Sequence, residues 1–483
     1  MRVTASRLVC FGCGHEVAPG TPYPFRCPRF RPGDDVDHVL RRRLDLGAPG
    51  LREELAAVFS DSEPNPFLRF RPLFHGYQEA RRAGWGDAAY RRLVERLDTE
   101  VQRVDGRGFR TTPFEPAPAL AAALGVRRVL VKDETGNVGG THKARHLMAL
   151  ALWLEAAREL HPEIAPPAPL AIASCGNAAL AAAIVARALD RPLTAFVPAE
   201  AEGRILARLD ALGAVKQVCA DHPAGAGDPA VHGFRAAVAA GALPFGVQGP
   251  DNGLTLEGGA TLGWEIAAAL ARRDHTLDRL LVQVGGGALA AATWRALDEA
   301  RALGVLARLP RLHAVQTEAS PLVRAWRGVV GEVGAAWRSA SGQQPPPADA
   351  PAELAGWVAE RVPPEVRDAV LHRAARRRSR YMRPWEGPLA SVAASILDDE
   401  TYDWLMVVEG MLATGGWPLT VPEELLLAAR RAAREATGEP ITASGSAGLA
   451  GALALSRAGL LDPDESLAVL FTAADLPAPR GDG

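Results

Sequence analysis

Lysine is rare in this chain, which makes each lysine informative. Of the 54 Lys and Arg residues, only Lys132, Lys143 and Lys216 are lysine. The abundance of Ala, Gly, Pro and Arg is typical of a GC-rich genome, in which lysine is expected mainly where arginine cannot replace it. A guanidinium stays protonated, whereas a lysine amine can lose its proton and attack a carbonyl group. Lys132 and Lys143 lie eleven residues apart, so this stretch is the first candidate for amine chemistry.

The stretch that ends at Lys143 has the pattern of a strand end, a polar loop with glycines and a helix start. The lysine closes the run Gly139-Gly140-Thr141-His142-Lys143. In an open α/β sheet this position faces the crevice at the carboxyl ends of the strands, where ligands bind. A helix N-terminus disfavours a cation, so we expect an anionic partner there, and a phosphate would serve. The alternative is a surface lysine that snorkels to solvent.

A second turn, Ser174-Cys175-Gly176-Asn177-Ala178, joins a predicted strand to an Ala-rich helix. Backbone N–H groups at a helix N-terminus form a natural anion site, which would suit the carboxylate of a substrate. Taken alone, an ordinary strand-to-helix turn with a good N-cap explains this segment better.

A third loop, Gly285-Gly286-Gly287-Ala288, follows the apolar strand Leu280 to Val284. Residues without side chains let the backbone approach a phosphate closely, and the next helix contributes its positive end. The loop also fits the dinucleotide fingerprint, with Glu318 as a possible ribose ligand. This second interpretation would make the chain an NAD(P)-dependent oxidoreductase.

The fourth segment runs from Thr442 to Gly448 and contains Ser444 at a predicted strand end. Its hydroxyl could bond a cofactor ring nitrogen or cap the helix that follows. The stretches Ser391 to Asp399 and Arg380 to Trp385 are expected where substrate-side loops would lie. For Asp398 and Asp399, helix capping or solvent exposure is the favoured interpretation.

The elements that must position these segments alternate between short apolar strands and helices. Such βαβα alternation predicts a parallel sheet with helices on both faces, and therefore an α/β protein. Strands are expected at 128–132, 170–173, 193–197, 215–219, 244–248, 279–284, 311–316, 440–443 and 466–472. Helices are expected at 142–159, 178–189, 202–212, 230–240, 260–271, 288–302, 422–437 and 446–458.

Taken in order, the four segments resemble the fold-type-II family of pyridoxal 5'-phosphate (PLP) enzymes, in its threonine synthase-like branch, over about residues 110 to 475. The resemblance implies two open parallel-type sheets covered by helices, with the cofactor in the cleft between domains. It implies that Lys143 is catalytic and forms the Schiff base with PLP. The implied cofactor ligands are Lys143, His142, Asn177, Gly285, Gly286, Gly287, Ala288 and Ser444. The implied substrate ligands are Ser174, Cys175, Gly176, Asn177 and Ala178.

This resemblance also implies a division of the chain. Residues 1–110 form a helical extension with a cysteine-containing start. Residues 111–150 and 245–475 form the large PLP-binding domain, with an insertion at about 319–395. Residues 151–244 form a smaller α/β domain that carries the Ser-x-Gly-Asn loop. In the insertion, we expect the basic run from Arg373 to Arg383 to be a solvated helix face.

The chain departs from the family at two places. Threonine synthases usually have Ser-Phe-Lys-Asp-Arg where this chain has Thr-His-Lys-Ala-Arg, and the His-Lys pair is similar to the tryptophan synthase β chain. The start, with Cys10, Cys13 and Cys27, resembles the zinc-ribbon start of some threonine synthases. Phe30 stands where a fourth cysteine would be, so a four-cysteine zinc site is not supported and no metal is assigned. His15 and His38 are the residues that would replace it.

The resemblance places a neutral serine at the cofactor's ring nitrogen, which weakens the ring as an electron sink and favours loss of a β-leaving group over transamination. We therefore expect a PLP-dependent lyase that abstracts the α-proton of a small amino acid and eliminates its β-substituent, as an ammonia-lyase or β-replacement enzyme. The alternatives are a threonine synthase acting on O-phosphohomoserine, the NAD(P)-dependent oxidoreductase, and a non-catalytic PLP-binding protein.

Composition excludes few classes of protein, but it bears on the partners and the cellular compartment that we expect. The formal net charge of −2 gives no reason to expect a nucleic acid or an anionic membrane as partner. No apolar run reaches the roughly 20 residues that span a bilayer. Five cysteines and no signal-peptide pattern favour the cytoplasm. The family resemblance makes a homodimer possible.

Overall fold

The computed structural model describes residues 6–163, 168–174, 176–199, 201–219 and 228–476. Its larger sheet has the order β11-β10-β9-β12-β4-β3. All neighbours in it are parallel except β3 and β4, which pair antiparallel. Its strands are β3 (Phe114–Pro116), β4 (Arg128–Asp133), β9 (Arg279–Gln283), β10 (Arg311–Gln316), β11 (Leu419–Thr420) and β12 (Ser466–Phe471).

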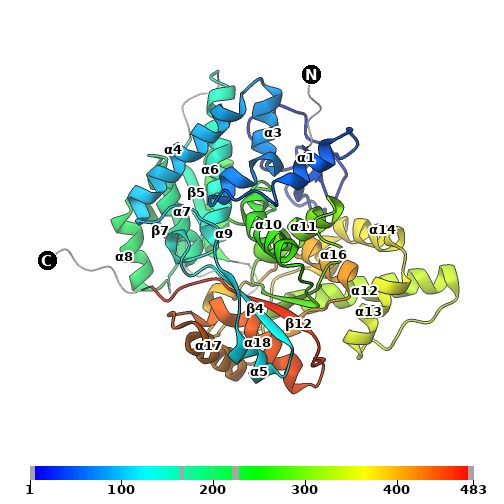
Figure 1. Ribbon diagram of the computed structural model, residues 1–483. Coiled ribbons are helices and arrows are strands. Elements are labelled where there is room, and N and C mark those ends of the chain that lie inside the picture. Colours follow the sequence, from blue (N-terminus) through cyan, green and yellow to red (C-terminus); the bar gives the residue numbers. More distant parts are fainter. Residues whose placement is uncertain (1–5, 164–167, 175, 200, 220–227, 477–483) are drawn as a thin grey trace.

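Helices cover both faces of this sheet (Figure 1). On one side lie α5 (Pro118–Leu124), α17 (Glu423–Thr437) and α18 (Ala443–Arg457), and on the other α10 (Thr255–Arg273), α11 (Ala288–Ala302) and α16 (Trp404–Thr414). The central strands β9 and β12 are buried at every position, as expected for parallel strands covered on both faces.

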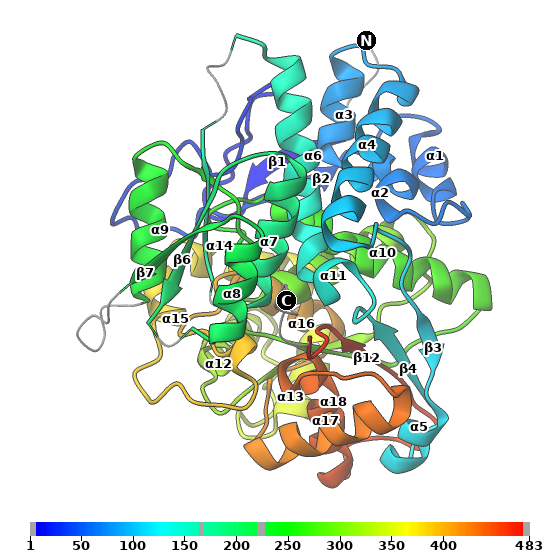
Figure 2. The same cartoon turned by 90° about the vertical axis from the view of Figure 1, so that its left-hand side faces the viewer.

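A smaller sheet has the order β7-β6-β5-β8, with all neighbours parallel. Its strands are β5 (Leu170–Ala173), β6 (Leu193–Pro198), β7 (Val215–Cys219) and β8 (Leu243–Pro244). The helices α7 (Asn177–Ala188) and α8 (Gly203–Ala211) lie on one side of this sheet, and α9 (Pro229–Ala239) lies on the other (Figure 2). The predicted fold class, with two open parallel-type sheets covered by helices, is therefore confirmed.

The helix α6 (Lys143–Leu160) joins the two halves of the molecule. Its apolar residues are distributed all around the helix, and it packs against α3 (His75–Arg82), α4 (Asp87–Asp105), α7 and α10. A helix that is apolar on every face is a buried helix. The small alanines of α7 allow it to lie close to α6, and both helices begin at predicted site residues, Lys143 and Asn177.

The N-terminal section contains more regular structure than its sequence suggested. The strands β1 (Ser6–Cys10) and β2 (Leu40–Leu44) form an antiparallel pair. Short helices α1 (Leu51–Ala57) and α2 (Pro66–Arg69) and the single turn η1 (Arg71–Leu73) lead to α3 and α4. The predicted insertion is helical, with α12 (Pro321–Ser341), α13 (Pro351–Arg361), α14 (Pro364–Ala375), α15 (Arg378–Tyr381) and the turn η3 (Ala394–Ile396).

Three predicted elements differ in the structure. The strand expected at 244–248 is reduced to β8, because the chain turns after Pro244 toward Thr255. The strand expected at 440–443 is a single bridge between Ile441 and Ala474, and α18 already begins at Ala443. The helix α10 begins five residues earlier than predicted, where Glu257 is buried against the N-terminal section. Among the described residues no helix is long and apolar enough to cross a bilayer.

Candidate active site

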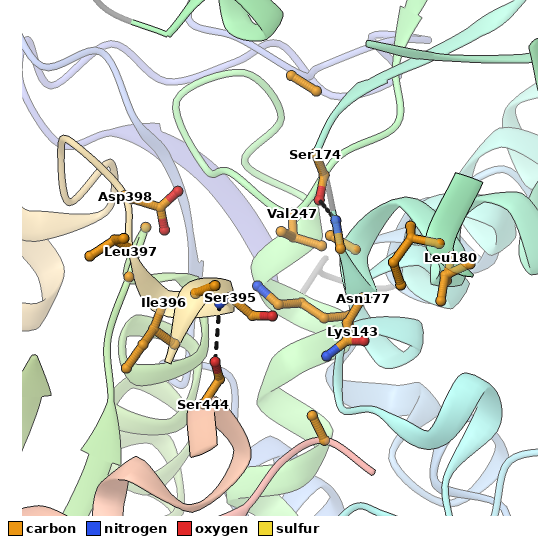
Figure 3. A pocket seen from close by; sticks show the side chains of 18 of the residues that line it. Lys143, Ser174, Asn177, Leu180, Val247, Ser395, Ile396, Leu397, Asp398 and Ser444 are labelled. Carbon is orange, nitrogen blue, oxygen red and sulfur yellow. Dashed lines mark hydrogen bonds between the residues drawn. The ribbon is translucent and has the colours of Figure 1, made fainter. Parts of the chain in front are cut away.

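Lys143 lies at the wall of a cavity of about 640 Å³ between the two sheets. The chain reaches this lysine from β4 through η2 (Val138–Gly140), where Gly139 and Gly140 both have positive φ. Thr141 then bridges to Ala473 beside the end of β12, which fixes the start of α6. Figure 3 shows the Lys143 side chain extending across the cavity toward Ser395 and Ile396. Within the described part of the chain, its amine has no hydrogen bond or ion pair.

A buried ion network holds the helix turn that carries this lysine. Arg145 donates to Glu134 (2.7 Å) and to Glu265 (2.6 Å), and all three side chains are inaccessible to solvent. Lys132 pairs with Glu265 and donates to the carbonyl of Thr112 (2.7 Å). Two cations and two carboxylates thus balance, as burial requires. Lys132 is therefore a structural lysine and not a second reactive amine.

Lys216, the third lysine, is a surface residue. Its amine pairs with Asp210 at 2.6 Å on the edge of the smaller sheet, where arginine could replace it. The argument from the scarcity of lysine therefore holds for the buried residues Lys132 and Lys143. It does not hold for Lys216.

Burial sets the protonation of the groups around Lys143. Desolvation lowers the pKa of the Lys143 amine, and Asp398 and Asp403 partly oppose this effect. Desolvation and the neighbouring Lys143 charge lower the pKa of His142 well below its usual value. The imidazole of His142 is thus neutral, and its Nδ1 lies 3.2 Å from the carbonyl oxygen of Thr472. A lysine amine whose pKa is lowered in this way is closer to the neutral form that attacks a carbonyl or accepts a proton.

The turn after β5 lies across the cavity from the glycine loop. Ser174 accepts a hydrogen bond from the N–H of Gly176 (3.3 Å), and Asn177 begins α7 beside Lys143 (Figure 3). Ser174, Gly176, Asn177 and Ala178 all line the cavity. Cys175, also predicted as a substrate ligand, lies outside the described residues.

The glycine loop 285–287 joins β9 to α11 and forms another wall. Gly287 has a φ of 99°, a conformation that favours glycine, and it precedes the first turn of α11. The segment 396–402 packs closely on this loop, and a Cβ at Gly285 would lie 2.9 Å from the Cα of Ile396. The carboxylate of Asp398 lies against this loop, because its Oδ2 is the nearest atom that a Cβ at Gly285 would meet. This loop therefore has a carboxylate as its neighbour in the cavity.

Ser444 lies in the first turn of α18, and its hydroxyl accepts a hydrogen bond from the N–H of Ser395 (3.0 Å; Figure 3). The alternative role predicted for this serine was to cap the helix. Thr442 caps α18 instead, since its Oγ1 accepts the N–H of Gly445 at 2.9 Å. The Ser444 hydroxyl is therefore left to face the cavity.

Asp398 corrects an expectation from the sequence. The favoured interpretation, helix capping or solvent exposure, is wrong, because both Asp398 and Asp399 line the cavity. Burial raises the pKa of Asp398 to about 6, against the opposing effect of Lys143. The sequence gave a weak signal, since 391–399 was expected near the substrate, but no local pattern shows that a loop of the insertion returns to β9. Arg204 and Arg208 of α8 also line this cavity and were missed.

The residues around this cavity fit pyridoxal phosphate. A carboxylate already lies against the glycine loop, and a backbone N–H already bonds to the Ser444 hydroxyl. The two contacts come from Asp398 and Ser395, at opposite ends of one short segment. The segment 394–398 thus forms the part of the cavity wall that faces both the glycine loop and Ser444.

Glu318, the ribose ligand required by the dinucleotide interpretation, is exposed and does not line the cavity. The glycine loop therefore lacks the acidic partner that this alternative needs.

Comparison with known proteins agrees with this geometry. A threonine synthase of Methanosarcina acetivorans is 26% identical over 232 residues, which are 44% of this chain and 49% of that protein, so the chain spans about half the length of this relative. Diaminopropionate ammonia lyase from Escherichia coli superposes with a TM-score of 0.54 at 17% identity, over 80% of this chain and 89% of that one. A PLP-dependent aspartate racemase gives 0.53 at 16% identity, over 80% and 97%. The family model described as "Pyridoxal-phosphate dependent enzyme" matches residues 107–394. The chain belongs to the family of pyridoxal-phosphate-dependent enzymes.

Proposed function

We propose that this protein is a PLP-dependent lyase that abstracts the α-proton of a small amino acid and eliminates its β-substituent. The observation that supports it most is the Lys143 amine, which lies at the cavity wall with a lowered pKa and no close partner among the described residues. Such an amine can bond to the cofactor aldehyde and, once displaced by a substrate, act as the general base.

Each part of the cavity has a role in this proposal. The glycine loop 285–287 and Ala288 hold the phosphate, and the Ser444 hydroxyl faces the ring nitrogen. His142 and Asn177 hold the cofactor beside Lys143. Bound PLP supplies an electron sink for the pair left at Cα. The turn 174–178, at the N-terminus of α7, binds the substrate carboxylate through its N–H groups.

The proposal is tested first by covalent chemistry. We expect purified protein with PLP to show a visible absorption band that borohydride removes, with the reduced adduct on a peptide that contains Lys143. Lys143→Ala should lose this adduct and lower the rate of ammonia and keto-acid release from serine, threonine and diaminopropionate by at least about 10³-fold. Lys216→Ala is the matched control, because it removes a surface lysine and should retain both. A transamination product, or normal turnover by Lys143→Ala, contradicts the proposal.

A second candidate is a threonine synthase-type reaction on O-phosphohomoserine. Arg204 and Arg208 favour it, since they bring two guanidinium groups to the cavity. An ion pair with Asp475 at 2.9 Å fixes the position of the Arg204 guanidinium. A phosphate-bearing substrate needs such cations. Release of inorganic phosphate with formation of threonine would select this reaction, and Arg208→Ala should then raise KM for O-phosphohomoserine but not for serine. A spectrum unresponsive to every amino acid would select a non-catalytic role instead.

The division into three regions and the positions of their boundaries remain part of this proposal, as do a homodimeric state and a cytoplasmic location. The two sheets support the division, because β3–β4 and β9–β12 belong to one and β5–β8 to the other. Expression of residues 111–483 without the extension would test the first boundary.

A further inference from the structure

Four metal-ligating side chains converge in the N-terminal section, outside the residues matched by the family. Their ligand atoms, Cys10 Sγ, Cys13 Sγ, Cys27 Sγ and one nitrogen of His38, all lie within 4.8 Å of one another. Cys10, Cys27 and His38 are buried, and Cys13 is partly exposed. The Cys13 and Cys27 sulfurs are 3.6 Å apart, which is too far for a disulfide. We propose that these residues bind one Zn²⁺ ion in a closed Cys₃His site.

The backbone around the cluster supports this assignment. The turn from Cys10 to Cys13 is closed by bonds from Gly14 N to Cys10 O (3.0 Å) and from Cys10 N to His15 O (2.8 Å). Such a turn presents two sulfurs on one side. The N–H of Arg29 lies 3.4 Å from Cys27 Sγ and donates to it. Hydrogen bonds of this kind to ligand sulfurs are part of the support of a metal site.

His38 is oriented for a metal by a carboxylate. Its Nε2 lies 3.0 Å from Asp34 Oδ2, and its Nδ1 faces Cys10 Sγ at 3.4 Å. A histidine that ligates zinc through one nitrogen commonly donates the other N–H to a carboxylate, which fixes the ring. His15, the other substitute that the sequence allowed, is not part of the cluster. The tertiary structure thus selects His38 as the fourth ligand in place of the cysteine that Phe30 replaces.

Three thiolates and one imidazole favour zinc over hard cations, and four protein ligands leave no open position. The site is therefore structural. It gathers residues 10, 13, 27 and 38 into one unit, and two sides of that unit contact elements that frame the cavity.

The first contact reaches the insertion. Asp37 N donates to Ala375 O (2.6 Å) and Arg378 N to Asp35 O (2.9 Å). Arg378 in turn pairs with Glu400 at 2.6 Å, two residues after the cavity-lining Asp398. The prediction that the 373–383 run is a solvated face therefore fails at Arg378, which is half-buried between the N-terminal section and Glu400.

The second contact reaches the segment before α10. Arg26, next to Cys27, pairs with Asp251 at 2.6 Å and donates to Pro250 O at 3.2 Å. The N–H of Gly253 donates to Phe25 O (2.9 Å). This segment begins at Val247 and Gln248, which line the cavity. The zinc site thus fixes two supports of the cavity wall, on the insertion and on the segment 247–254.

The test is the metal content of the intact chain. Protein purified under reducing conditions is expected to hold one zinc per chain by mass spectrometry, and cobalt exchange should give thiolate charge-transfer bands with the intense d–d bands of a tetrahedral site. Cys13→Ser and His38→Ala should lose most of the zinc. Cys219→Ser and His15→Ala are matched controls that should retain it. If the ligand variants are insoluble, cobalt exchange into the wild type decides alone.

Three results would overturn the proposal: no zinc or cobalt bound after reduction and reconstitution, a Cys13–Cys27 disulfide in the reduced preparation, or retention of zinc by His38→Ala with loss by His15→Ala. A separate measurement tests whether the zinc site supports the cavity wall. Chelated protein should exchange amide hydrogens faster at 374–379 and 250–254, and unchanged exchange there would refute that part. None of these measurements uses turnover, so they stand or fall separately from the lyase.

Discussion

Replacing Lys132 by methionine should destabilise the protein strongly, although this side chain does not reach the cavity. Lys132 is inaccessible to solvent and provides one of the two cations that balance Glu134 and Glu265. Lys132→Met keeps the length of the stem but leaves a net charge of −1 inside the protein. It also leaves the carbonyl of Thr112 without this donor. Breaking a buried pair on one side costs about 3–5 kcal/mol.

The charge balance provides an internal control. In Lys132→Met/Glu265→Gln the network returns to one cation, Arg145, and one carboxylate, Glu134. We therefore expect the double variant to recover about 1–3 kcal/mol of the single variant's loss. Lys216→Met breaks a surface pair and should cost about 0–1 kcal/mol.

The assay is urea unfolding of the cofactor-free protein, followed by far-ultraviolet circular dichroism, for wild type and four variants: Lys132→Met, Glu265→Gln, their combination and Lys216→Met. Net charge in a dry interior is the proposed cause, so the double variant must be more stable than the single variant. The reasoning is refuted if Lys132→Met costs less than about 1 kcal/mol, or if the losses of Lys132→Met and Glu265→Gln simply add.

Three further outcomes are expected. Asp398→Asn should lower the PLP concentration for half-saturation at pH 8 several-fold in absorbance titrations. The difference from wild type should shrink below pH 6, because Asp398, with a pKa of about 6, is then protonated. An equal effect at every pH contradicts this prediction. Burial raises the pKa of Asp403 to about 8, so this carboxyl keeps its proton in the folded state, whereas the unfolded chain releases it near 3.8. The free energy of unfolding should therefore fall by up to about 1.4 kcal/mol per pH unit as the pH rises between these two values. Asp403→Asn should flatten the profile of thermal midpoint against pH. Gly287→Ala should lower the free energy of unfolding by about 1–2 kcal/mol because of its φ of 99°. It should also weaken PLP binding, since the new Cβ would lie 3.0 Å from Thr401. Gly304→Ala, which has a positive φ and open space around its Cβ, should lose stability but leave PLP binding unchanged in the same titrations.

The sequence predicted the alternation of strands and helices well where a strand is fully buried. β9 contains the apolar run Leu280–Val282 and β12 the run Leu467–Phe471, so their positions follow from local pattern. It failed at 244–248 and 440–443, where a short apolar run lacks a partner strand of equal length. Pairing partners lie far away in the chain, so the length of an edge strand is a tertiary property.

The same contrast holds for the site. Residue type alone pointed to Lys143, because a lysine amine has chemistry that arginine lacks. The order of the four motifs was sufficient for the family, and the structure places residues of all four around one cavity. The sequence placed the stretch 391–399 near the substrate but assigned Asp398 and Ser395 no specific role, because that role comes from contacts with Gly285 and Ser444, which lie more than forty residues away along the chain.

By itself, the sequence determined the amine at Lys143, the glycine loop, the α/β class and the family, since each depends on residue type and local spacing. The tertiary structure alone decided that Lys132 is a structural cation, that 394–398 lines the cavity and that His38 joins three cysteines. These features depend on which distant groups the fold brings together. A charged group that is buried must be paired with an opposite charge, lose its charge or bind a metal, so its role is set by its neighbours in space.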